Sequence, residues 1–457
     1  MERSPALDKV LLTVCAADLL VTLDGTVVTV ALPAIQRDLQ VAAPQLQWVV
    51  TAYTLTLGAF LLVGGRAADF FGRRRVLVWG LTVFTLASAG AGLARDVAVL
   101  LPLRALQGLG AAFAVPAALA ILSAVYRRER DRQAALGYLS ATMDVSMVAG
   151  LVLGGVLTAT LGWPWCFFVI VPVGLLAAAL APAALPESRD DHAARLDVRG
   201  AVLAAVGFAA LSLGIVQLQH RDLTAVPLLV AACGVLILFV RVERRTRDPL
   251  VRLDVFRHRP LSGANLAISA NAGGFGGLMF LSTLNLQQVL GYDALHTGLL
   301  YVPLAVSACA GGVITPHLIG RTGVRRTAVI SMSVTAATFL LLAWRSEELV
   351  VLLVAFLVSG FTFAAAFVPL TSQGLTGVSD GEKGLASGLL QTSTHLGGAL
   401  VLTVLATAAA FRTSAVSSRS TESAMTSGFS LAFLVGAVLL LLGAATAFRT
   451  LPRDVSG

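Results

Sequence analysis

Charged residues are scarce in this sequence of 457 residues. They make up 13% of it, whereas soluble domains carry about 25%. Apolar residues make up 57%, and the mean hydropathy is +0.84. This composition excludes an ordinary soluble globular protein, because too few charges remain to cover a water-exposed surface. It indicates an all-α polytopic protein embedded in a lipid bilayer.

Cysteine is also scarce, and none of the four cysteines has the CxxC spacing of a metal or redox site. Each lies in an apolar run, so we expect buried thiols rather than disulfides or metal ligands. The six histidines are scattered, and no combination of a nucleophile with a base stands out. We therefore expect no enzyme activity, no metal site and no cofactor.

The sequence lacks the phosphate-binding pattern GxxxxGK[ST]. It also has no hydrophilic segment large enough to form an ATPase domain or the output domain of a sensor. If this protein is a pump, an ion gradient must drive it.

What the sequence does contain is a series of long apolar runs. Runs of about 17–25 residues can cross the hydrocarbon core as helices. We place fourteen spans at residues 9–33, 45–64, 76–94, 97–123, 134–160, 164–184, 199–217, 224–240, 262–288, 297–319, 326–343, 348–374, 384–411 and 427–447.

The basic residues are distributed unevenly between the two sides of this predicted arrangement. Most of the 33 lysines and arginines fall on the side shared by the even-numbered connections and both termini, including the clusters at 127–132 and 241–247. An excess of Lys and Arg marks the cytoplasmic side. We therefore predict that both termini are cytoplasmic. The formal net charge of +8 reflects this topology, and we expect no binding of nucleic acid.

Two charged interruptions divide the chain. Pro186–Arg199 and Arg241–Pro260 bracket two spans rich in Ala, Leu, Val and Gly. Without this inserted pair, six spans remain on each side, and both halves keep the same orientation. We predict a six-helix bundle at 1–185, a linker with two extra spans at 186–260 and a second six-helix bundle at 261–457. In parallel-repeat transporters of this design the substrate site lies between the halves, near the middle of the membrane.

Four charged residues stand out inside the predicted spans: Asp18, Asp24, Arg104 and Asp144. Each costs about 2.5–3.5 kcal/mol on insertion scales, so such residues are functional candidates. We expect Asp24, Arg104 and Asp144 to take part in proton coupling. Arg104 has no acid near it in the sequence, so its partner must lie on another helix, and Asp24 and Asp144 are the alternatives. A fixed ion pair that only locks helix packing is the competing interpretation.

Other polar residues in the spans are candidates for a substrate cavity. Asp18 lies nearer to the predicted cytoplasmic end, where it could be solvated. Gln107 follows Arg104 by three residues, and His395 follows Gln391 by four, so each pair shares a helical face. For His395, an ordinary polar packing contact is the alternative. The candidates are Asp18, Gln107, Asn271, Asn285, Gln391 and His395.

The fifth predicted span carries small residues at regular spacing. Ser146 and Gly150 are four residues apart, Gly150 and Gly154 form a GxxxG pair, and Gly155 follows. Such spacing allows helices to approach closely. Ordinary helix packing is one interpretation. We favour an interface that moves.

A short basic segment, Gly65–Arg75, joins the second and third predicted spans. We expect a hairpin loop, with three consecutive arginines marking the cytoplasmic side. A weaker copy occurs in the second half, where Gly323 is followed by clustered arginines as Gly72 is in the first half.

These motifs together resemble the major facilitator superfamily, and in particular its fourteen-span drug:proton antiporter group. The matching positions are Gly65, Asp69, Gly72 and Arg73–Arg75 in the signature loop; Leu23-Asp24 with Thr26 and Ala31-Leu32-Pro33 in span 1; Trp48–Tyr53; Leu101–Ala112 in span 4; Gly150, Gly154 and Gly155 in span 5; and Gly384–Leu389. The similarity extends over essentially the whole chain, including the inserted pair.

The sequence departs from the family pattern at a few positions. Ala67, Phe70 and Thr29 replace the usual Leu, a basic residue and Asn. Leu151 replaces a proline of the antiporter motif and Ser146 a glycine. A helix without that proline keeps its backbone hydrogen bond and should kink less.

The resemblance implies a role for Arg104 in proton coupling and a conformational switch at Gly65, Asp69, Gly72, Arg73, Arg74 and Arg75. We interpret the switch as a latch favouring the outward-open state, with arginines that pair with acids across the two halves. The expected protein is a monomeric multi-pass exporter of the bacterial plasma membrane. It would exchange hydrophobic or cationic drugs or antibiotics for protons, with the proton gradient as its energy source. The alternative is a metabolite or peptide carrier of the same fold with different ion coupling.

Overall fold

The computed structural model describes residues 5–41, 43–126, 129–188, 197–218, 225–246, 249, 251, 253–376, 383–416 and 420–452. In these residues every regular element is a helix. The first helices are α1 (Pro5–Asp38), α2 (Ala43–Leu46), α3 (Trp48–Phe71), α4 (Arg73–Gly92), α5 (Val97–Val125), α6 (Glu129–Thr160), α7 (Pro164–Phe168), α8 (Ile170–Ala184), α9 (Val198–Gln217) and α10 (Ala225–Arg245). The chain continues through η2 (Leu253–Arg257), α11 (Arg259–Leu284), η3 (Asn285–Val289), α12 (Ala294–Leu300), α13 (Val302–Thr322), α14 (Val324–Arg345), α15 (Leu349–Gly374), α16 (Lys383–Thr392), η4 (Ser393–Gly397), α17 (Gly398–Ala415) and α18 (Thr421–Thr450).

Twelve helices among the described residues are long and apolar enough to cross a membrane. They coincide with twelve of the predicted spans. The remaining two predictions fall on α6, whose described apolar stretch Val145–Thr160 is shorter, and on α11, which is not one of the twelve. The all-helical membrane architecture is thus confirmed. The count of fourteen spans and the cytoplasmic position of both termini stay predictions.

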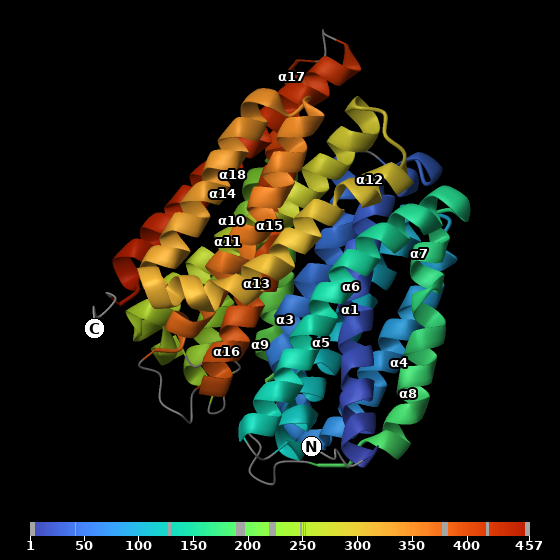
Figure 1. Cartoon of the computed structure of the whole chain (residues 1–457), viewed down its shortest axis with the longest axis vertical. Helices are drawn as coiled ribbons and strands as arrows, with labels where there is room; N and C mark the ends of the chain where they lie inside the picture. Colours follow the sequence, from blue (N-terminus) through green and yellow to red (C-terminus); the bar gives the residue numbers. More distant parts are fainter. Residues whose placement is uncertain are drawn as a thin grey trace. The chain divides into compact units, whose positions relative to one another are not determined.

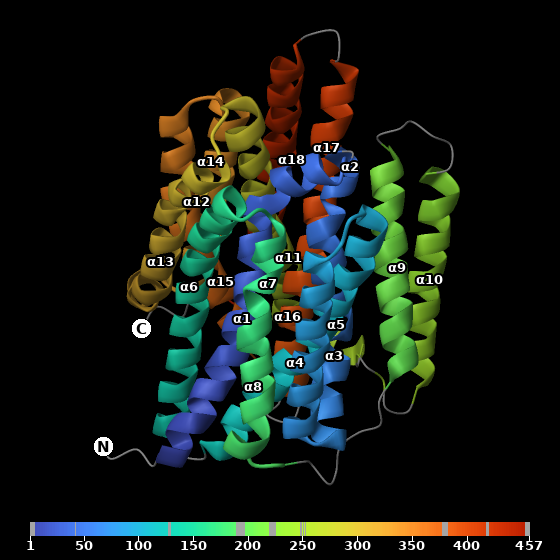
Figure 2. The ribbon, with the colours of Figure 1, turned by 90° about the vertical axis from the view of Figure 1, so that its right-hand side faces the viewer.

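The chain divides into two compact units. The first comprises Met1–Val41, Trp48–Ala205 and Arg247–Leu250, and the second comprises Ala42–Gln47, Val206–Thr246 and Val251–Gly457. In Figure 1 the blue-to-green helices α1 and α3 to α8 belong to the first unit, and the yellow-to-red helices from α11 to α18 belong to the second, as does the short helix α2. Figure 2 shows α9 and α10 side by side, and Gly207 of α9 faces Leu236 of α10. The three-part division at residues 185 and 260 stays a prediction.

Glycines set how closely the helices of the first unit approach. A Cβ at Gly64 of α3 would overlap the backbone of Ala112 on α5, and a Cβ at Gly108 of α5 would overlap the Tyr53 carbonyl on α3. Inside a membrane the hydrophobic effect does not drive helices together, because lipid tails are as apolar as the helix surfaces. Close approach of two helix backbones instead adds van der Waals contacts, and these favour association. The α3–α5 contact therefore depends on glycine at both positions.

The small residues of α6 do pack against another helix, as their spacing indicates. A Cβ at Gly154 would lie 2.7 Å from the Val27 carbonyl oxygen of α1, and a Cβ at Gly150 would overlap the Thr26 side chain. Close packing of the span-5 motif is confirmed. Movement at this interface stays a prediction.

The expected hairpin loop at Gly65–Arg75 is wrong in its extent. Helix α3 continues through Phe71, α4 begins at Arg73, and only Gly72 separates them. Gly72 has φ 107° and ψ 130°, a backbone conformation that glycine alone adopts readily, so one residue is enough to change the chain direction. Gly323 repeats this between α13 and α14 with φ 86° and ψ 159°. The internal repeat that aligned the two glycines is therefore confirmed in the backbone.

Candidate functional site

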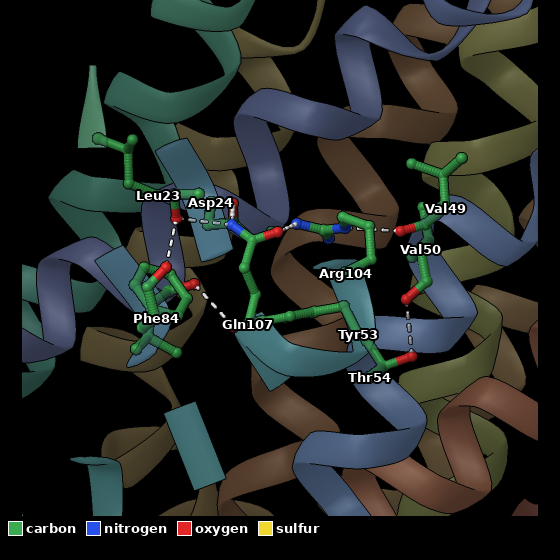
Figure 3. Close-up of polar contacts among 12 residues, drawn as sticks. Leu23, Asp24, Val49, Val50, Tyr53, Thr54, Phe84, Arg104 and Gln107 are labelled. Atoms are coloured by element: carbon green, nitrogen blue, oxygen red, sulfur yellow. Dashed lines mark hydrogen bonds and ion pairs between the residues drawn. The ribbon is translucent and has the colours of Figure 1, made fainter. Parts of the chain in front are cut away.

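The first unit contains an ion pair that is shielded from solvent. Arg104 of α5 and Asp24 of α1 are 1% and 0% exposed, and Arg104 Nη1 lies 2.6 Å from Asp24 Oδ2. Figure 3 shows the two side chains pointing toward each other from different helices. Of the two acids proposed as partners for Arg104, the structure shows Asp24.

Gln107 connects the two charges to a third helix. Its amide oxygen accepts a hydrogen bond from Arg104 Nη1 at 2.9 Å, and its amide nitrogen donates to Asp24 Oδ1 at 3.0 Å. The same nitrogen lies 2.8 Å from the Ser88 hydroxyl on α4, and Ser88 donates to the Phe84 carbonyl. Both carboxylate oxygens of Asp24 are thus hydrogen-bonded within this buried network.

The rest of the guanidinium is held by α3 and α7. Arg104 Nε donates to the Val49 carbonyl at 2.8 Å. Its Cζ lies 4.7 Å from the centre of the Tyr53 ring and 5.7 Å from that of Phe167. Aromatic faces attract cations at such distances. Arg104 of α5 therefore contacts α1, α3 and α7, and separating it from Asp24 would remove its ion pair with α1.

The structure contradicts the expectation that Asp18 is solvated. Asp18 is 7% exposed. Its Oδ2 has no hydrogen-bond partner among the described residues. Sequence position near the end of a span was the basis for the expectation, but α1 continues to Pro5 and carries Asp18 well inside the bundle.

Asp144 belongs to α6, but its side chain lies outside the described residues. Ser146, two residues on, is 1% exposed and donates a hydrogen bond to the Thr142 carbonyl at 2.6 Å. Gly155 lies in the same helix. The roles proposed for these residues stay predictions.

The polar candidates of the second unit lie on four helical segments. Asn271 of α11 donates to the Phe363 carbonyl at 3.2 Å, while its Oδ1 has no partner among the described residues. Asn285, the first residue of η3, donates to the Ser346 carbonyl at 2.6 Å. Gln391 is exposed on α16, and His395 is half-buried in η4. Their assignment to a substrate cavity stays a prediction.

Sequence reasoning missed an aromatic stack beside Asn271. The rings of Phe275 on α11 and Phe363 on α15 lie 4.3 Å apart at 25°, and Phe367 continues the stack at 6.2 Å and 22°. All three are partly exposed. The signal was available, because Phe363 and Phe367 are four residues apart on one helical face.

The three arginines after Gly72 pair with acids of their own unit, contrary to the expectation of pairing across the halves. Arg73 forms an ion pair with Asp69 at 2.9 Å. Arg74 and Arg75 lie 3.5 Å and 3.6 Å from Glu187. Sequence reasoning overlooked Glu187 because it follows α8, more than a hundred residues away.

Glu187 also binds the beginning of α4. The backbone N–H of Arg74 donates to its carboxylate at 3.2 Å, and the N–H of Arg73 donates to the Ser188 carbonyl at 2.9 Å. A carboxylate at a helix N-terminus is stabilised by free N–H groups and the helix dipole. A Cβ at position 72 would lie 2.6 Å from the carboxylate, so Gly72 permits this contact as well as the turn.

We expect Gly72→Ala and Gly323→Ala each to destabilise the protein by roughly 1–3 kcal/mol, the usual cost of a strained backbone position. Both glycines have positive φ. Gly320→Ala is the matched control, because a Cβ there meets nothing within 4 Å and its φ is not positive. Thermal unfolding of the purified variants in detergent measures the effect. Equal unfolding temperatures for all three variants would contradict the prediction.

Comparison with known families places these features in context. A family model described as Major Facilitator Superfamily matches residues 14–402. The puromycin resistance protein pur8 of Streptomyces alboniger is 36% identical over 98% of this chain and 93% of its own length. The cephamycin export protein CmcT of Amycolatopsis lactamdurans is 37% identical over 87% of this chain and 84% of its own. The lincomycin resistance protein of Streptomyces lincolnensis is 34% identical over 83% and 80%.

Solved structures share the fold at low sequence identity. A bacterial homologue of the human lysosomal transporter Spinster, in an inward-facing and unoccupied conformation, matches with a TM-score of 0.70 at 16% identity, covering 98% of this chain and 97% of that one. The nucleoside transporter NupG matches with a TM-score of 0.69 at 12% identity, covering 96% and 99%.

Proposed function

Because the chain belongs to the major facilitator superfamily, we propose that it exports hydrophobic or cationic drugs or antibiotics in exchange for protons. It is a multi-pass membrane transporter and not an enzyme. Beyond this class, we propose the direction of transport, the cargo and the coupling ion. Alternating access, in which a central site opens to one side at a time, is the mechanism we propose.

The buried Asp24–Arg104–Gln107 network is the observation that carries the proposal. A carboxylate and a guanidinium in a dry site form a strong pair, whereas a protonated carboxyl group attracts the guanidinium much less. Protonation of Asp24 would therefore release Arg104 from α1. The helices held together by the pair could then take a second arrangement, which would couple proton uptake to a conformational change.

Two observations support the proposed cargo. Relatives are named for resistance to puromycin and lincomycin and for export of cephamycin. The stack of Phe275, Phe363 and Phe367 presents partly exposed rings. Aromatic side chains of this kind suit a largely apolar molecule. We further propose the bacterial plasma membrane as its location and a monomer as the working form.

Transport by the purified full-length protein in proteoliposomes tests the function. With puromycin or tetraphenylphosphonium as the probe, we expect an imposed pH gradient to drive transport by the wild type. Asp24→Asn should reduce the stimulation by the gradient roughly 5–150-fold, the usual range of coupling between two sites. Asp254→Asn is the control, since Asp254 is an exposed acid outside the spans.

Three outcomes would count against this proposal. Transport that is equal with and without a pH gradient would exclude proton exchange, and transport driven by a sodium gradient instead would favour the alternative ion coupling. An Asp24→Asn variant that responds to the pH gradient as the wild type does would remove Asp24 from the coupling.

A further inference from the structure

Two buried acids of α1, Asp18 and Asp24, have opposite surroundings. Asp24 is bonded through both carboxylate oxygens, to Arg104 and to Gln107. Asp18 is almost as deeply buried, yet its Oδ2 has no hydrogen-bond partner among the described residues, and no described cation forms an ion pair with it. The same helix thus holds one acid that is fully compensated and one that is not.

An uncompensated carboxylate is costly inside a protein in a membrane. A buried charge without a partner loses its hydration and gains nothing in return. A neutral carboxylic acid avoids most of this cost, and so does a carboxylate neutralised by a bound cation. In the state described here, the surroundings of Asp18 therefore favour a neutral carboxylic acid.

Among the described side chains, the groups around Asp18 supply no fixed counter-charge. Cys15 lies one turn earlier on α1, and Tyr53 faces it from α3. Arg104 of α5 is bound to Asp24, and Cys166 of α7 is a thiol near the same site. Helix α8 carries no titratable residue. The side chain of Asp144 on α6 lies outside the described residues.

One position on the face of α1 that carries Asp18 borders open space. Gly25 is seven residues further on, about 20° away around the helix and roughly 10 Å along it. A Cβ at Gly25 would meet no heavy atom within 4 Å. Thr29 continues this face, and its hydroxyl donates to the Gly25 carbonyl at 2.9 Å. Asp18 itself is 7% exposed, so this open space begins about two helical turns away from it.

We propose that Asp18 is a second proton-binding carboxyl group, which holds a proton while Asp24 stays paired with Arg104. Asp18 takes this proton from a hydronium ion of the adjoining water, which forms an O–H bond on the carboxyl group and leaves a neutral water molecule, and the reverse step returns the proton. After the proton leaves, the remaining carboxylate can bind a cationic substrate in its place. This use of Asp18 rests on the proposed function, since it makes proton and cation alternative ligands of one carboxyl group.

Infrared difference spectroscopy tests the proton directly and needs no transported substrate. We expect the spectrum of wild type minus Asp18→Asn, recorded at neutral pH, to show the C=O band of a protonated carboxyl group. Asp24→Asn should retain that band, and Asp18→Glu should restore a carboxyl band. A difference spectrum without a protonated-carboxyl band, in a variant that unfolds at the wild-type temperature, would overturn the proposal.

Transport measurements distinguish a failure of the role of Asp18 from a failure of the proposed function. In proteoliposomes, Asp18→Asn should reduce stimulation of tetraphenylphosphonium transport by a pH gradient roughly 5-fold or more, and Asp18→Glu should recover part of it. If the wild type does not respond to the gradient, the proposed function fails. If the wild type responds and Asp18→Asn responds equally, the function stands and the role of Asp18 fails.

Discussion

Replacing Arg104 with alanine is expected to destabilise the protein by about 3–5 kcal/mol, the cost of breaking a buried ion pair by removing one partner. The variant would leave the Asp24 carboxylate, which is 0% exposed, without its cation. It would also remove the hydrogen bond to the Val49 carbonyl and the packing of the guanidinium against Tyr53. Proton-driven export should be lost together with stability. Thermal unfolding in nanodiscs and transport in proteoliposomes measure the two effects.

A double variant distinguishes loss of the pair from loss of packing. Asp24→Asn combined with Arg104→Gln leaves no buried charge and keeps polar groups that can bond to Gln107. We expect it to be more stable than Arg104→Ala, because the uncompensated carboxylate is gone. Its transport should no longer respond to a pH gradient. An Arg104→Ala variant with wild-type stability would show that the pair does not hold these helices together.

Gly64→Leu is the second substitution with a large expected effect. A side chain at position 64 must enter the backbone of α5 at Ala112, and a backbone, unlike the end of a flexible side chain, cannot rotate away. Inserting atoms into packed interiors typically costs about 1–3 kcal/mol and occasionally more. We expect a cost at or above the upper end of this range, seen as a lower unfolding temperature and a smaller yield of folded protein.

The neighbouring glycine provides the control. A Cβ at Gly65 would lie 3.6 Å from the Pro116 side chain, an ordinary contact distance. Gly65→Ala should therefore fold and unfold as the wild type does, whereas Gly64→Ala should already be destabilised. If the two alanine variants have the same unfolding temperature, α3 and α5 are not held at the separation described here.

The sequence predicted the positions of the helices well, because the hydrocarbon core requires long apolar runs. It also predicted that Arg104 needs an acid on another helix, because a lone charge there is too costly. It did not predict which acid, since Asp24 and Asp144 both satisfied that requirement. The choice depends on how the helices are rotated about their axes, and hydropathy carries little information about rotation.

The errors have a different cause. The segment before Gly72 looked like a loop because it is charged, yet Arg66, Ala67 and Ala68 all form helices readily, and a single glycine changes the direction of the chain. Glu187 was overlooked because its partners Arg74 and Arg75 are distant in sequence. The stack was overlooked although Phe363 and Phe367 are four residues apart, and its third ring, Phe275, comes from another helix. Solvation of Asp18 was considered from its position in the span alone, which carries no information on the helices that surround it.

The closed pair of Asp24 and Arg104 also has an electrical consequence. A membrane potential acts on net charge with about 2.3 kcal/mol per elementary charge per 100 mV. The charges of an aspartate and an arginine 2.6 Å apart sum to zero. Moving α1 and α5 together with this ion pair intact would therefore displace almost no net charge through the field of the membrane. Voltage would then bias the transport cycle mainly through the protons and cations that it carries, and exchange of one proton for one monovalent cation would be electrically silent.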